Sequence, residues 1–150
     1  LVDLARSDVG RVAKPGTVAV ARFMDVERFS HVQHIVSRVQ GALRADLDAL
    51  DALQALFPAG TVSGAPKVRA MQWIARLEPV ARGPYAGVVG LLSLRGSRDT
   101  AIAIRTAFFD PNEVCLQAGA GVVAYSDPAR EFAETEHKLA PVRQALGGGA

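Results

Sequence analysis

The sequence predicts an α+β fold built mostly from antiparallel strands. Segments in which apolar and polar residues alternate indicate strands, and segments with apolar residues three or four apart indicate helices. The two kinds of segment do not alternate strictly, as they would in a parallel βαβ sheet. Of the 150 residues, 49% are hydrophobic and 21% are charged, which excludes a disordered chain.

Prolines and a helix-capping residue indicate where the helices start and stop. The predicted helices are residues 1–6, 48–57 and 67–77, and a last helix that runs from 127 to about 139 or beyond. Pro58 stops the second, and Pro66 suits the first turn of the third. Asp127 followed by Pro128 is a helix start, and Pro141 is expected to kink or end the last helix because proline lacks an N–H donor.

The predicted strands follow turn signals and β-branched residues. They are residues 17–24, 32–39, 85–94, 101–108 and 114–118, with a continuation at 122–125. Arg105 lies inside an apolar run of one strand, where a guanidinium is costly unless it is paired. We therefore expect it to meet a carboxylate of the protein or of a ligand. Cys115 is expected to be an inert core residue.

Charge and hydropathy exclude several classes of protein. The formal net charge is +2 and the arginines are spread along the chain, so we expect no nucleic-acid partner. No apolar stretch is long enough to span a membrane. The single cysteine excludes an internal disulfide framework and a cysteine-based zinc site. Without an export signal, a cytoplasmic location is expected.

The last predicted helix gathers charged residues on one face. Glu131, Glu134 and Lys138 fall within roughly 60° of one another at helical spacing. Two carboxylates can bind a hard cation, with the lysine close to an anionic substrate. The alternative is a solvated face carrying a Glu134–Lys138 ion pair, and spacing alone favours this alternative.

Three further motifs leave two interpretations each. Residues 119–124 fit a G-x-G-x-x-A pattern, but no helix starts there, so the turn either binds an anion or is a β-bulge. Residues 60–67 are not a P-loop and form either an anion site or a loop leading into a helix. His34 is either a general acid–base or a hydrogen-bonded core histidine.

Several stretches together resemble the chorismate-utilising enzymes, and within that family the anthranilate synthase component I group. The longest is Phe-Pro-Ala-Gly-Thr-Val-Ser-Gly-Ala-Pro-Lys-Val-Arg-Ala-Met at 57–71. The others are residues 3–11, 34–37, 82–90, 101–106, 117–122 and 131–138. The resemblance implies part of an α/β sandwich of mostly antiparallel sheets with outer helices. It also implies that residues 1–150 are the C-terminal portion of a single chorismate-binding catalytic domain.

The resemblance implies roles for the charged and polar residues. Glu131 and Glu134 would bind Mg²⁺ beneath the ring carboxylate of chorismate, which reverses the preference drawn from spacing. His34 would favour loss of the side chain as pyruvate, and Thr61 would face the substrate. The residues implied in substrate binding are Tyr85, Arg105, Gly119, Ala120, Gly121, Lys138, Ser63 and Gly64.

The implied reaction converts chorismate to anthranilate and pyruvate, with ammonia from a glutaminase partner. The alternatives are an aminodeoxychorismate synthase, an isochorismate or salicylate synthase, and a non-catalytic chorismate-binding fragment. Ser7 departs from the asparagine usual in the family. Further family motifs lie upstream of the segment that corresponds to Leu1, so we expect the 150-residue chain to have little or no turnover by itself.

Overall fold

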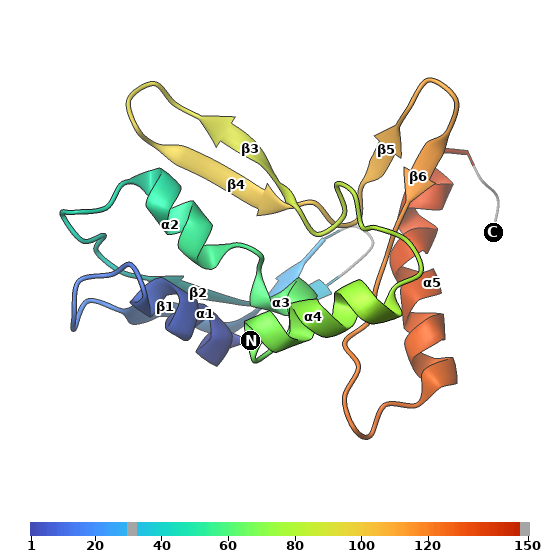
Figure 1. Ribbon diagram of the computed structural model, residues 1–150, viewed down its shortest axis with the longest axis horizontal. Helices are drawn as coiled ribbons and strands as arrows, with labels where there is room; N and C mark the ends of the chain where they lie inside the picture. Colours follow the sequence, from blue (N-terminus) through green and yellow to red (C-terminus); the bar gives the residue numbers. More distant parts are fainter. Residues whose placement is uncertain (30–32, 148–150) are drawn as a thin grey trace. The chain divides into compact units, whose positions relative to one another are not determined.

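The structure, a computed structural model, describes residues 1–29 and 33–147. It is a mixed α+β fold, as the sequence predicts, and it divides into two compact units. Unit 1 is Leu1–Thr61 with Leu91–Asp99, and unit 2 is Val62–Gly90 with Thr100–Ala150. The elements in chain order (Figure 1) are α1 (Val2–Gly10), β1 (Ala19–Arg28), β2 (Gln33–Gln40), α2 (Ala49–Leu56), α3 (Gly60–Ser63), α4 (Lys67–Leu77), β3 (Val88–Leu92), β4 (Arg98–Ile102), β5 (Ala107–Phe109), β6 (Val114–Leu116) and α5 (Pro128–Ala145).

Unit 1 is organised where α1 packs against β2 and α2. Among the residues of unit 1 that the structure describes, Val12 and Ala13 are the buried hydrophobic ones, and Ala13 forms an antiparallel bridge with Leu43. Gly41 lies against this bridge, because a Cβ built on it would lie 2.8 Å from the Ala13 Cβ. A larger residue would collide with a buried side chain, so the close approach of the two segments requires glycine here.

Helix α2 starts at a complete capping box. The Asp48 carboxylate accepts hydrogen bonds from the backbone N–H of Leu50 (2.6 Å) and Asp51 (3.0 Å). The Asp51 carboxylate accepts one in return from the Asp48 N–H (2.8 Å). These bonds satisfy donors that a helix end otherwise leaves unpaired. The helix then ends before Pro58, as predicted.

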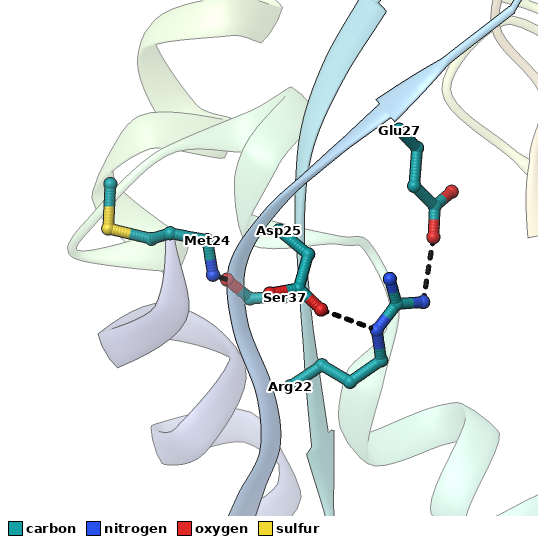
Figure 2. Close-up of polar contacts among 5 residues, drawn as sticks. All are labelled: Arg22, Met24, Asp25, Glu27 and Ser37. Atoms are coloured by element: carbon teal, nitrogen blue, oxygen red, sulfur yellow. Dashed lines mark hydrogen bonds and ion pairs between the residues drawn. The ribbon is translucent and has the colours of Figure 1, made fainter.

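Strands β1 and β2 form an antiparallel ribbon whose register shifts on both sides of Arg22. At the irregularity Met24 has a left-handed φ of 56°, and its N–H donates to the Ser37 hydroxyl (3.0 Å). Arg22 donates to the Asp25 carboxylate (2.9 Å) and to the Glu27 carboxylate (2.7 Å), as Figure 2 shows. The Ser37 hydroxyl thus accepts a backbone donor at the bulge, and the Arg22 ion pairs join side chains beside it.

Unit 2 has its buried hydrophobic residues at the base of the β3–β4 pair. The Ala86 N–H donates to the Ala103 carbonyl, and the Ala103 N–H donates to the Gly87 carbonyl, both at 2.9 Å. Ala86 and Ala103 are both buried. Strands β5 and β6 form a separate antiparallel pair. The first strand of this unit begins at Val88 rather than at residue 85, because residues 82–87 form hydrogen-bonded turns.

The single strand predicted for residues 101–108 is wrong, because it breaks at Arg105. Arg105 adopts a left-handed φ of 52° between β4 and β5 and is exposed. The Ile104 N–H donates to the Ile102 carbonyl (2.9 Å), and the Thr106 hydroxyl donates to the Ile104 carbonyl (2.8 Å). Local turn bonds therefore replace the ladder that the alternating apolar residues predict.

Two expectations near the third strand are also wrong. Residues 122–125 form no strand, because the Val123 N–H donates to the Ser126 hydroxyl and the Ser126 N–H donates back to the Val123 carbonyl, both at 3.0 Å. Cys115 lies in β6 but is exposed rather than buried in a core. In a two-stranded sheet a residue stays exposed unless another element covers its face.

Helix α5 continues beyond residue 139 and through Pro141 to Ala145, so of the two expected effects of Pro141, an end of the helix is wrong. Proline removes one helical donor and frees the carbonyl four residues earlier, at His137. Both residues are exposed, so water can satisfy that carbonyl. In the part of the chain that the structure describes, no helix is long and apolar enough to cross a membrane.

Candidate functional site

Helix α5 places three of the predicted residues on successive turns. Its first turn is fixed because the Asp127 carboxylate accepts the Arg130 N–H (2.9 Å) and Pro128 stands at the first position. Glu131 is half-buried and Glu134 is exposed. The cap fixes where the helix begins, and helical spacing then places Glu131, Glu134 and Lys138 on one face.

Lys138 joins this helix to the Gly119 segment. Its ammonium lies 2.6 Å from the Glu134 carboxylate and donates to the Gly119 carbonyl at 2.8 Å. The hydrogen bond and charge of Lys138 lower the pKa of Glu134, which is therefore ionised at neutral pH. The ion pair expected from the spacing is present, and the same lysine also holds the glycine turn.

The Gly119 segment lies against the ring of Tyr85. A Cβ built on Gly119 would lie 2.9 Å from the Tyr85 hydroxyl oxygen, so this approach requires glycine. Tyr85 is half-buried, and its hydroxyl lies against Gly119, the residue whose carbonyl Lys138 binds. Gly121, by contrast, has open space where a Cβ would be. Ala120, between them, is half-buried.

Residues 60–67, for which the sequence predicts either an anion site or a loop leading into a helix, contain the short helix α3. Thr61, its second residue, is exposed, whereas Ser63 and Gly64 are half-buried. Gly64 has a φ of 130°, and a Cβ on it would lie 2.9 Å from the Ala70 Cβ of α4. The predicted substrate-facing residues thus lie on a turn that is tightly packed against the helix it precedes.

His34 belongs to unit 1 and is held by the β-ribbon. It lies in β2 opposite Glu27 of β1 and is half-buried. Its ring is tilted by 54° against that of Phe29, with the centroids 6.1 Å apart. Glu27, which lies opposite His34, already accepts a hydrogen bond from the Arg22 guanidinium (Figure 2).

The described residues contain no group of three or more His, Cys, Asp or Glu side chains that could hold a metal ion. Glu131 and Glu134 are two hard oxygen donors one turn apart on α5. Magnesium usually takes one or two carboxylates and completes its shell with substrate oxygens and water. The donor chemistry therefore fits a partial magnesium site, in which Lys138 would have to share Glu134 with the ion.

Unit 2 brings together Tyr85, Gly119, Lys138 and Glu134 through consecutive contacts. Arg105 lies at an exposed turn of the same unit. Sequence reasoning missed Arg82, whose guanidinium lies 5.5 Å from the centroid of the Tyr85 ring. The signal was available, since an arginine three residues before an aromatic residue across a Gly-Pro turn lies within reach of the ring.

Comparison with known proteins gives concordant matches. A family model described as chorismate binding enzyme matches residues 1–144. Anthranilate synthase component 1 of Aquifex aeolicus is 59% identical over 146 residues, covering 97% of this chain and 30% of that protein. The protein of the same name from Saccharolobus solfataricus is 56% identical over 147 residues, covering 98% of this chain and 35% of that protein.

Solved structures agree with these relatives. Anthranilate synthase component I from Streptococcus pneumoniae matches with a TM-score of 0.88 and 50% identity, covering 93% of this chain and 32% of that one. A Bacillus anthracis protein classed as an isochorismate synthase matches with a TM-score of 0.87 and 31% identity, covering 99% of this chain and 39% of that one. The chain thus spans about a third of the length of the proteins it matches.

Proposed function

We propose a function from one premise, which is that the chain belongs to the chorismate binding enzyme family, whose model matches residues 1–144. The chain forms the C-terminal portion of the catalytic domain of an anthranilate synthase component I. The relatives of that name, at 59% and 56% identity, support this choice within the family. The enzyme converts chorismate and ammonia to anthranilate, pyruvate and water, and a glutaminase partner supplies the ammonia.

The observation that carries the proposal is the contact series Tyr85–Gly119–Lys138–Glu134 in unit 2. Chorismate has two carboxylates, so its site needs cationic and hydroxyl groups for one and a way to balance the charge of the other. Tyr85 and Arg105 bind the carboxylate of the enolpyruvyl side chain, assisted by backbone N–H groups of residues 119–121. Lys138 keeps those residues in position through the Gly119 carbonyl.

Glu131 and Glu134 hold Mg²⁺ in this proposal. When bound, the ion offsets the charge of the ring carboxylate and orients the ring. The two carboxylates are suited to this because the pKa of Glu134 is lowered by Lys138, so Glu134 needs no deprotonation to bind a cation. Lys138 in turn limits the net negative charge of the helix face when the ion is absent.

The remaining roles concern the bonds that change. Ammonia attacks C2 of chorismate and the 4-hydroxyl leaves as water, after which the side chain leaves as pyruvate and the ring becomes aromatic. His34 assists the loss of pyruvate as a general acid–base. Thr61 faces the substrate, and Ser63 and Gly64 frame the turn that carries it. These roles follow from the resemblance and stay predictions.

The test is a fluorescence assay for anthranilate with the complete gene product, chorismate, Mg²⁺ and an ammonium salt. We expect steady anthranilate formation that depends on both chorismate and ammonia. Residues 1–150 expressed alone are expected to give little or no product.

If the complete protein consumes chorismate without ammonia, the function is isomerisation, which the likeness to an isochorismate synthase makes the second candidate. If it forms 4-amino-4-deoxychorismate instead, it is an aminodeoxychorismate synthase. No consumption of chorismate at all contradicts all three candidates.

A further inference from the structure

All three guanidinium nitrogens of Arg82 donate hydrogen bonds within unit 2. Its Nε and Nη2 donate to the Glu78 carboxylate, and its Nη1 donates to the Val62 carbonyl at 2.6 Å. The Glu78 bond raises the pKa of Arg82, so the group stays charged throughout the accessible pH range. The arginine side chain is 24% exposed, which shields the pair more than is usual for a surface salt bridge.

The same guanidinium lies over the ring of Tyr85. The distance from Cζ of Arg82 to the ring centroid is 5.5 Å, within the range of a cation–π contact. The backbone joins the two residues as well, because the Tyr85 N–H donates to the Arg82 carbonyl at 3.0 Å. Tyr85 is therefore held on one side by Arg82, while its hydroxyl lies against Gly119.

Arg82 also reaches the turn that holds two other predicted site residues. Val62, whose carbonyl it binds, lies in the chain between Thr61 and Ser63. One side chain thus links this turn to the aromatic ring of Tyr85. A lysine could not replace it, because a single ammonium lacks the planar fork that bonds a carboxylate and a carbonyl while stacking on a ring.

We propose that Arg82 is a positioning residue that fixes the Tyr85 ring, and with it the hydroxyl, for substrate binding. The inference rests on the proposed function for its substrate, chorismate, but its geometry is independent of it. Arg82 touches no reacting atom in this scheme and acts through Tyr85. Its loss should therefore weaken chorismate binding and leave the chemical step nearly unchanged.

The experiment compares Arg82→Gln with Arg69→Gln in the complete gene product. Arg69 is a matched control, because its guanidinium lies 5.0 Å from the Trp73 ring and donates to Gln72 on the exposed helix α4. We expect Arg82→Gln to raise KM for chorismate about tenfold, with kcat changed by less than about twofold. Arg69→Gln should leave both unchanged. A fall in kcat with constant KM for Arg82→Gln overturns the proposal.

A double-mutant cycle separates positioning from general loss of structure. If Arg82 acts through Tyr85, then Arg82→Gln with Tyr85→Phe should have a KM within about twofold of Tyr85→Phe alone. If the effects of the two substitutions on KM multiply in the double variant, the proposal is overturned. Arg82→Lys should not restore KM. If Arg82→Gln does not fold, Glu78→Gln is a milder variant. It weakens the bond that holds the guanidinium but keeps the guanidinium itself, and KM for chorismate should again rise.

A spectroscopic measurement keeps this inference distinguishable from the proposed function. With fluorotyrosine incorporated, the ¹⁹F signal of Tyr85 should shift or sharpen in Arg82→Gln and stay unchanged in Arg69→Gln. If the two variants show this difference but the wild-type protein has no chorismate turnover, the proposed function fails and the positioning of Tyr85 stands. If turnover is present and the signal is unaffected by Arg82→Gln, the inference fails alone.

Discussion

Unit 1 holds His34, one of its predicted site residues, in a backbone ladder, whereas unit 2 holds Tyr85 and Lys138 by side-chain contacts. A ladder fixes the backbone of each residue whatever its side chain is. In unit 2 each member depends on its neighbour, since Lys138 binds the Gly119 carbonyl and Gly119 lies against Tyr85. The comparison predicts that substitutions in unit 1 change chemistry or stability, and substitutions in unit 2 change binding.

The largest expected effect is at His34. His34→Ala should lower kcat about a hundredfold, because it removes a general acid–base. KM for chorismate should stay within about twofold, since the ladder around the residue is unchanged. Steady-state kinetics of the complete enzyme measure both. His137→Ala, on the exposed side of α5, is the matched control and should behave as wild type. A rise in KM alone would remove the contrast between the units.

Next come the two carboxylates of α5. Glu131→Gln and Glu134→Gln should each raise the Mg²⁺ concentration for half-maximal activity at least about 10-fold, because loss of a residue that only supports a metal ligand already costs roughly 10–100-fold. Calorimetric titration of Mg²⁺ gives a second readout that does not need turnover. Glu136→Gln is the control, since Glu136 lies on the same helix and is paired with Arg143. Equal effects of all three variants would argue against a metal site on this face.

Gly41 tests the packing of unit 1. Gly41→Ala places a methyl group 2.8 Å from the Ala13 Cβ and 3.2 Å from Cγ1 of Val9. Overpacking of this kind should lower the free energy of unfolding by about 1–3 kcal/mol. Denaturant unfolding measures the loss, and KM of the remaining folded enzyme should not change. Unaltered stability would mean that the approach of these two segments is less tight than the structure has it.

Gly119 is the counterpart in unit 2. Gly119→Ala puts a methyl group 2.9 Å from the Tyr85 hydroxyl, and a rigid ring can avoid it only by tilting. KM for chorismate should rise about tenfold, with a smaller loss of stability than Gly41→Ala causes. Gly10→Ala at the end of α1, where nothing lies within 4 Å, is the control. A large loss of stability with a normal KM would mean that Gly119, like Gly41, serves packing rather than substrate binding.

The smallest effect concerns the cap of α2. Backbone N–H groups of Asp51 and Leu50 donate to Asp48 and lower its pKa from the ordinary 3.8. A lowered pKa stabilises the fold above the ordinary value, and this stabilisation is lost as the pH falls through the lowered one. Asp48→Ala should lower Tm by about 2–4 °C at about pH 6. Melting curves should show the difference shrinking below pH 3.8; a constant difference would contradict the sign.

The helices were predictable because their signals are local. Asp48 with Pro58 bounds α2, and Asp127 with Pro128 starts α5, using only bonds within a few residues. Helix α4 spans Lys67–Leu77, as predicted. The sequence left open whether Pro141 kinks or ends α5, because the cost of a proline depends on whether water reaches the freed carbonyl, which is a property of the folded surface.

The candidate site was predictable in its residue types and not in its contacts. Spacing indicated the Glu134–Lys138 pair, and the structure adds that Lys138 also bonds the Gly119 carbonyl 19 residues away. Arg105 was expected inside a strand, but its left-handed backbone depends on turn bonds that compete with the ladder. The contact of Arg82 with Tyr85 depends on a side-chain rotamer that no sequence pattern specifies.

The sequence by itself determined where helices start, which residues carry charge and which family motifs stand in order along the chain. These properties depend on interactions within one turn of chain or on residue identity alone. The tertiary structure alone decided which glycines are needed for close approach, Gly41 against Ala13 and Gly119 against Tyr85. It decided this because contacts between distant segments depend on how those segments pack, and packing is fixed only when the chain is folded.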